Sequence, residues 1–137
     1  MNKLAFLLVT VALCSSSWAQ DSNAAKKIDA LVIVNGMQLH IDLVELGKPY
    51  EGMTPTHMTE DQTVLAIRVI VPESVNLDTV GNMKVWVTDN KGVRYEVAAA
   101  LIVEQNPVWL FAVAKTSESF ILHFPSGKTV DLSSLLR

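Results

Sequence analysis

The sequence predicts an all-β protein, an antiparallel β-sandwich of about seven or eight strands. Short apolar runs that alternate every second residue recur along the chain, and turns rich in glycine, proline or asparagine separate them. Beyond the N-terminal segment, no stretch shows the apolar period of a convincing helix. Many short strands without intervening helices are typical of two antiparallel sheets packed face to face.

The first 19 residues have the features of a signal peptide. Lys3 gives a positive start, an apolar run follows over 4–13, and Ser17 and Ala19 are the small residues that a signal peptidase reads. We expect cleavage after Ala19. The apolar run is shorter than the roughly 20 residues that cross a bilayer, so no transmembrane segment is expected after cleavage. These features predict an extracytoplasmic protein of bacterial type, either periplasmic or secreted.

Cys14 is the only cysteine of the chain, so its position decides its meaning. It lies in the predicted signal peptide, whose removal leaves a mature chain without a thiol, a disulfide or a cysteine metal site. A lipoprotein signal also ends in a cysteine, which leaves a lipid anchor at Cys14 as an alternative. Leu13 is bulky where such a signal has a small residue, and this favours ordinary secretion.

Removing 19 of the 137 residues leaves 118, the size of one domain. We expect a flexible polar leader over 20–27 and a single β-sandwich domain over 28–137. Loss of Lys3 changes the formal net charge from −3 to −4. A mildly acidic chain without a basic run is not expected to bind nucleic acid.

The dipeptide Asn35-Gly36 predicts the first hairpin, because a type I′ turn needs positive φ at both central residues. A β-branched run over 31–34 precedes it, and an alternating run over 37–44 follows. Strict alternation puts two sets of side chains on opposite faces: Met37, Leu39, Ile41 and Leu43 on one, and Gln38, His40, Asp42 and Val44 on the other.

Residues 45–62 predict a long surface connection, since they hold two prolines, two glycines and little periodicity. Such loops are often functional. The side chains that could contact a partner there are Tyr50, Met53, His57 and Met58. The alternative is that Tyr50 and one methionine fold back over the sheet as anchors.

The run over 64–71 is the most β-prone of the mature chain, and Pro72 ends it. Its odd-numbered residues are expected in the core, and Arg68 marks the other face as more exposed. A polar loop over 72–82 should follow. A strand over 83–88 then leads into a turn at 89–92, with Gly92 in the left-handed position, and into a strand over 93–97.

Residues 98–103 are ambiguous, because alanines favour helix and Leu-Ile-Val favours strand. We expect a strand, since 104–107 stop the run too early for a useful helix. The C-terminal stretch 108–132 predicts three short strands of one sheet layer. Phe120, Leu122 and Phe124 alternate in the second of these, before a turn at 125–128.

Three segments, 84–96, 108–115 and 120–124, are similar to immunoglobulin-like domains of unknown function on bacterial secreted proteins and lipoproteins. In that group a strand, an Asp-x-x-Gly turn and a tyrosine precede an apolar strand and a closing Phe-x-Leu-x-Phe strand. The resemblance covers about 64–132, and Ala114 departs from it where the group often has proline. It implies an extracytoplasmic immunoglobulin-like β-sandwich and brings no catalytic residues.

No catalytic or metal-binding pattern is found. The serines lack the spacing of a nucleophile elbow, so we expect no enzyme and no catalytic residues. Neither His40 with Asp42 nor His57 with Glu60 and Asp61 has the spacing of zinc ligands. The turn at 89–92 lacks the further carboxylates of a calcium loop. We therefore expect neither a metal nor a cofactor.

Two tryptophans are the residues whose pattern indicates a function. Trp86 shares a face with Lys84 and Thr88, opposite the expected core face, and Trp109 lies in a strand that is apolar on both sides. An exposed tryptophan commonly anchors a protein or a sugar ring, unless a loop such as 45–62 covers it. The hypothesis is a non-enzymatic binding module for a protein or glycan, with these contact residues: Trp86, Tyr50, His57 and Trp109. The alternative is an assembly subunit that pairs through an exposed edge strand.

Overall fold

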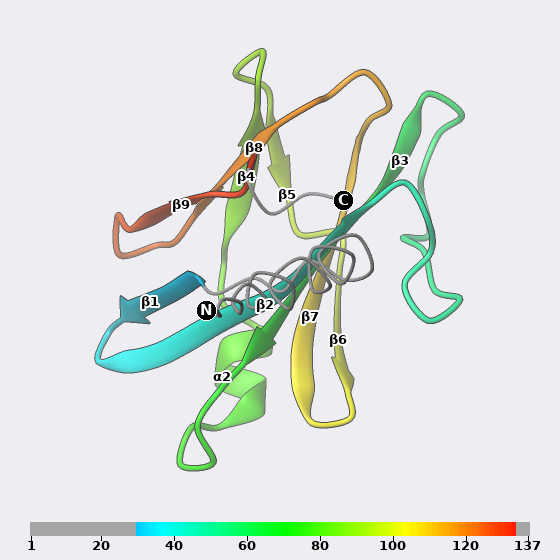
Figure 1. Ribbon diagram of the computed structural model, residues 1–137. Coiled ribbons are helices and arrows are strands. Elements are labelled where there is room, and N and C mark those ends of the chain that lie inside the picture. Colours follow the sequence, from blue (N-terminus) through cyan, green and yellow to red (C-terminus); the bar gives the residue numbers. More distant parts are fainter. Residues whose placement is uncertain (1–29, 134–137) are drawn as a thin grey trace, which may run out of the picture.

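The computed structural model describes residues 30–133, which form a sandwich of two antiparallel sheets (Figure 1). One sheet has the strand order β1-β2-β3-β7-β6, and the other has the order β5-β4-β8-β9. The predicted β-sandwich is confirmed, with nine strands in the described part of the chain. The predicted signal peptide, Cys14 and the leader lie outside the described residues. The strands are β1 (Ala30–Val34), β2 (Met37–Leu46), β3 (Gln62–Ile70), β4 (Trp86–Asp89), β5 (Arg94–Glu96), β6 (Ala99–Val103), β7 (Asn106–Ala114), β8 (Phe120–His123) and β9 (Thr129–Asp131).

A short helix, α2 (Leu77–Gly81), lies where the sequence predicted only a polar loop, so that prediction is wrong. Asn76 caps it, because its side-chain oxygen accepts hydrogen bonds from the N–H groups of Asp78 at 2.8 Å and Thr79 at 3.4 Å. Val80 is buried in the core. A helix of five residues is too short to show an apolar period, so the cap was its only sequence signal.

A β-bulge in β2 overturns the expected alternation of that strand. The pairing with β3 shifts between Ile41 and Leu43, which leaves Asp42 as the extra residue. One extra residue moves every later side chain to the other face. Val44 is therefore fully buried between the sheets, and Leu43 lies on the outer face, opposite to the faces predicted for both residues.

The two sheets enclose the main core, to which both contribute large apolar side chains. Phe120, Leu122 and Phe124, which alternate in the sequence, are all buried in it. Trp109 is also fully buried and meets Phe124 edge-on, with ring centroids 6.2 Å apart. Trp109 therefore cannot contact a partner as predicted. A strand that is apolar on both faces is central, not exposed.

The expected single layer over 108–132 is also wrong, because β7 belongs to one sheet, whereas β8 and β9 belong to the other (Figure 1). The connection after Ala114 crosses between the sheets. Alternation predicts which side chains are buried, but it does not say on which side of the core a strand lies.

Of two hairpin turns with positive φ, one has the residue types that favour this conformation and one does not. Asn35 and Gly36 have φ values of 52° and 81°, which confirms the predicted hairpin turn between β1 and β2. The strand predicted for 98–103 is also confirmed, as β6. Glu104 and Gln105, with φ values of 52° and 67°, form a second hairpin turn where the sequence suggested only a stop. Neither residue type is typical of positive φ, which explains why this turn was missed.

Replacing Gly36 with alanine should lower the free energy of unfolding by about 1 kcal/mol, because a Cβ at positive φ crowds the backbone. The loss comes from local backbone strain and not from a clash with other residues, since the added Cβ would meet no atom within 4 Å. Gly81→Ala is the matched control, equally unobstructed but outside the left-handed region. Urea unfolding should show a loss for Gly36→Ala and none for Gly81→Ala. Equal losses would contradict the assigned turn.

Candidate functional site

The structure does not bring the four predicted contact residues together. Trp86 lies on the outer face of the four-stranded sheet, whereas Tyr50 packs against the outer face of the five-stranded sheet. His57 is exposed on the long connection, and Trp109 is in the core. A single binding site that combines Trp86 with this connection is therefore excluded by their positions.

Tyr50 anchors the long connection over the outer face of the five-stranded sheet. Only 4% of Tyr50 is exposed. It packs in a second apolar cluster with strand residues, and Met58 lies at the edge of the cluster. The anchoring alternative is thus confirmed for Tyr50 and Met58. The other members are Val64, Ala66, Val108 and Leu110, with Leu43, Ala99, Leu101 and Val103 partly buried beside them.

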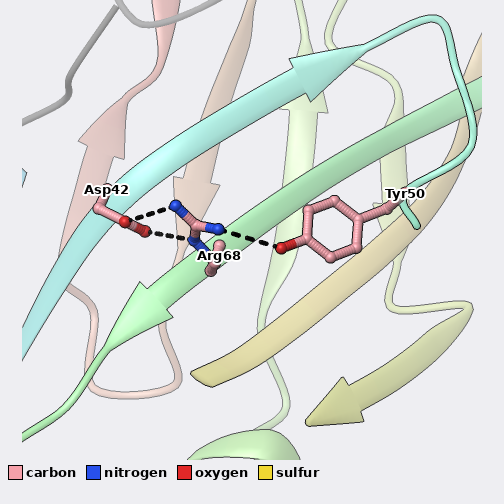
Figure 2. Close-up of polar contacts among 3 residues, drawn as sticks. All are labelled: Asp42, Tyr50 and Arg68. Carbon is pink, nitrogen blue, oxygen red and sulfur yellow. Dashed lines mark hydrogen bonds and ion pairs between the residues drawn. The ribbon is translucent and has the colours of Figure 1, made fainter. Parts of the chain in front are cut away.

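Arg68 links this anchor to the bulge, as Figure 2 shows. Its Nε donates to Asp42 Oδ1 at 2.9 Å and its Nη2 to Asp42 Oδ2 at 2.8 Å. Its Nη1 donates to the Tyr50 hydroxyl oxygen at 3.2 Å. The bulge makes the two-pronged pair possible, because the extra residue Asp42 and its neighbour both oppose Arg68.

The charge of Arg68 is fixed by this arrangement. The hydrogen bonds to Asp42 raise the pKa of the guanidinium above its ordinary value, against the opposite effect of partial burial. An arginine that stays protonated cannot act as an acid or a base, so the three residues form a structural clamp. We call Asp42, Tyr50 and Arg68 the loop clamp.

Tyr50→Phe should loosen the long connection with little loss of packing. It removes one hydrogen bond to a charged group, which is worth about 1.5 kcal/mol. Tyr50→Ala also removes the buried ring and should cost about 3 kcal/mol. A glutamate-specific protease can cleave the connection at Glu51 and Glu60, which are both exposed. Cleavage should be slowest in wild type, faster in Tyr50→Phe and fastest in Tyr50→Ala. Equal cleavage of all three proteins would show that Tyr50 does not hold the connection.

Asp89 closes the turn between β4 and β5 and ties it to the connection after β7. Its Oδ1 accepts from the N–H groups of Lys91 and Val93, both at 2.9 Å. Its Oδ2 accepts from the Ser117 hydroxyl at 2.7 Å and from the Tyr95 hydroxyl at 3.1 Å. The predicted turn is confirmed, with Gly92 at a φ of 80°. Four donors occupy this carboxylate, which gives it a structural role.

The acidity of Asp89 follows from these bonds. Burial alone would raise its pKa, but the hydrogen bonds from Ser117, Val93, Lys91 and Tyr95 together hold the pKa below its ordinary value. The folded state therefore binds this proton more weakly than the unfolded state. The resulting stabilisation is complete above the unfolded pKa of about 3.9 and is lost as the pH falls through the lower folded pKa.

Asp89→Asn should destabilise the protein by about 2 kcal/mol at pH 7, because an amide cannot accept all four hydrogen bonds. The difference between the two proteins should shrink as the pH falls from about 5 toward 2, since the wild-type carboxyl becomes protonated. Urea unfolding across this pH range measures it. A difference that stays constant would mean that the charge of Asp89 contributes nothing.

The Trp86 cluster, formed by Trp86, Arg94 and His123, lies on the outer face of the four-stranded sheet. The His123 ring stacks on Trp86 with centroids 5.2 Å apart and an interplanar angle of 4°. The Arg94 guanidinium carbon lies 4.1 Å from the centroid of the Trp86 ring. An ion pair with Glu96 holds Arg94, and a hydrogen bond of 2.9 Å joins His123 Nε2 to Thr88 Oγ1.

The strand order explains the two partners of the Trp86 ring. Because β4 lies between β5 and β8, Arg94 and His123 reach the ring from the two strands that neighbour β4. Trp86 is half-buried by these neighbours. The long connection does not cover it, since that connection lies on the other sheet. Alternation predicted the face of Trp86, but Arg94 and His123 were missed because their contacts depend on strand order.

Within residues 30–133, no three His, Cys, Asp or Glu side chains are placed to hold a metal ion. No helix in that range is long and apolar enough to span a membrane. Among these residues, the Trp86 cluster is a surface feature with specific side-chain contacts on an outer sheet face.

No protein-family model and no curated protein matches the sequence. The chain is similar to the crystal structure of an uncharacterized β-sandwich protein from Clostridium difficile 630, at 17% identity and a TM-score of 0.47. The likeness covers 76% of this chain and 89% of that one.

Proposed function

We propose that the protein is an exported, non-enzymatic module of immunoglobulin-like type that binds a partner protein through the Trp86 cluster. The signal-peptide features of residues 1–19 support export, and the sequence resemblance supports the immunoglobulin-like assignment. The observation that carries the binding role is the stack of Arg94, Trp86 and His123 on an outer sheet face.

That face differs from the other outer face of the sandwich. The long connection and Tyr50 cover the five-stranded sheet, whereas the side chains around Trp86 remain exposed or half-exposed. Ile121 adds an exposed apolar side chain on the same face. Tryptophan and arginine are the residues most enriched in the energetic centres of protein interfaces.

The geometry favours a protein over a sugar as the partner. A sugar ring stacks on a free aromatic face, but the Arg94 guanidinium and the His123 ring already lie against Trp86. The Arg94 guanidinium contacts Glu96 and the Trp86 ring while its side chain stays 54% exposed. An exposed guanidinium can donate hydrogen bonds to a carboxylate or a carbonyl group of a protein.

Trp86→Ala should abolish partner capture and cost about 2 kcal/mol of stability, because the half-buried ring loses its contacts with both Arg94 and His123. A photoreactive residue at Lys84, exposed near Trp86, can test this in the native host. A cross-linked protein should form at position 84 and disappear with Trp86→Ala.

Two controls separate binding from folding. Gly36→Ala should also lower stability, by about 1 kcal/mol, without changing the face that carries Trp86, so it should keep the cross-link. A photoreactive residue at Gln38, on the other sheet, should not capture the same protein. A loss of 3 kcal/mol or more for Trp86→Ala, typical of a core aromatic residue, would make Trp86 structural. Loss of the cross-link in Gly36→Ala would contradict the assignment equally.

A further inference from the structure

Strand β1 lies at one edge of the five-stranded sheet, and no described residue blocks that edge. Within residues 30–133 it pairs on one side only, with β2. It has no charged residue and no proline, and Leu31 and Ile33 on its outer face are 61% and 48% exposed. Natural edge strands are commonly blocked by charges, prolines or bulges, which prevent pairing with another chain.

The other edges are better protected. Both edges of the four-stranded sheet carry charges, Arg94 and Glu96 in β5 and Asp131 in β9. Strand β6 is uncharged, but α2 contacts it and its outer-face side chains pack beside Tyr50. The open edge with the largest exposed apolar side chains is therefore β1.

The hairpin fixes which backbone groups of β1 face outward. In a hairpin with a two-residue turn, the flanking residues Val34 and Met37 form a hydrogen-bonded pair. Pairing then alternates along the ladder, so Val32 and Ala30 also direct their N–H and C=O groups toward β2. The N–H and C=O groups of Leu31 and Ile33 consequently point to the open edge.

We propose that two copies of this chain pair antiparallel through β1, with the two-fold axis at Val32. In this register Leu31 of one copy lies opposite Ile33 of the second copy, and the reverse. Each such pair exchanges two N–H···O=C hydrogen bonds, and the two five-stranded sheets become continuous. This surface is separate from the Trp86 cluster, so either proposal can fail without the other.

A second copy fits this edge because the register is self-complementary. The exposed side chains of Leu31 and Ile33 then lie against those of the second copy and leave water. The mature chain is expected to be acidic, yet β1 and the facing part of β2, 37–41, contain no acidic residue. Like charges therefore do not meet at the axis. Pairing through a strand of five residues should bury less surface than the roughly 1,200 Å² that stable interfaces bury. The dimer should therefore be weak and concentration-dependent.

Single cysteines test the register. With Cys14→Ser, the chain has no other thiol whether or not its leader is removed. Val32→Cys places two thiols on the axis, at a Cα separation of about 4.5 Å that permits a disulfide. Leu31→Cys places them diagonally, about 7–8 Å apart, where a disulfide is disfavoured.

Under mild oxidation, Val32→Cys should form covalent dimers at least tenfold faster than Leu31→Cys. Random collision predicts the reverse order, because Val32 is only 8% exposed and Leu31 is 61% exposed. Faster cross-linking of Leu31→Cys, or none in either variant, would overturn the proposal.

Sedimentation velocity from about 5 to 500 μM, a range suited to weak association, tests the interface without cross-linking. Wild type should associate as its concentration rises. Leu31→Lys with Ile33→Lys should remain monomeric, because like charges then face each other, and Leu31→Glu with Ile33→Lys should restore the dimer. Ile102→Lys, at an exposed side chain of the protected strand β6, should leave the dimer unchanged. A monomeric wild type, or dissociation by Ile102→Lys alone, would overturn the proposal.

Discussion

Strands β3 and β7, central in the five-stranded sheet, are apolar on both faces, and the rest of the structure depends on covering them. One face is covered by the four-stranded sheet, which encloses Trp109 and Phe111. The other needs a second cover, because Val64, Ala66, Val108 and Leu110 lie on it. The long connection supplies that cover through Tyr50. Tyr50, which the sequence places in a surface loop, is therefore part of an apolar core cluster.

The loop clamp joins this cover to the irregularity in β2. Asp42 can meet Arg68 in a two-pronged ion pair because the bulge adds a residue at that point. Arg68 then reaches the Tyr50 hydroxyl, so a backbone defect in one strand helps to position a loop residue (Figure 2). The bulge also explains why Val44 and not Leu43 enters the core. The bulge thus lets β2 place Val44 in the main core and Leu43 beside Tyr50 on the outer face.

The sequence predicted features that depend on neighbouring residues, and missed those that depend on strand order. The Asn35-Gly36 turn, the buried positions of Phe120 and Leu122, and the face of Trp86 follow from local geometry. The buried state of Trp109 and the stack of Arg94 on Trp86 require knowing which strands are neighbours. The bulge at Asp42 has no local signal at all, since its residues read as ordinary alternation. Long-range pairing therefore set the limit of prediction, as it does for β-proteins generally.

The proposed dimer would change what the Trp86 cluster can achieve. Pairing through β1 uses the edge of the five-stranded sheet, whereas Trp86 lies on the outer face of the other sheet. Self-association and partner binding would therefore not compete for the same surface. A two-fold dimer would present two Trp86 clusters in a fixed relation, and a partner with repeated sites could bind both at once. While the two copies are paired, the two contacts would act with the effective concentration of a linked pair, so partner binding and self-association would strengthen each other.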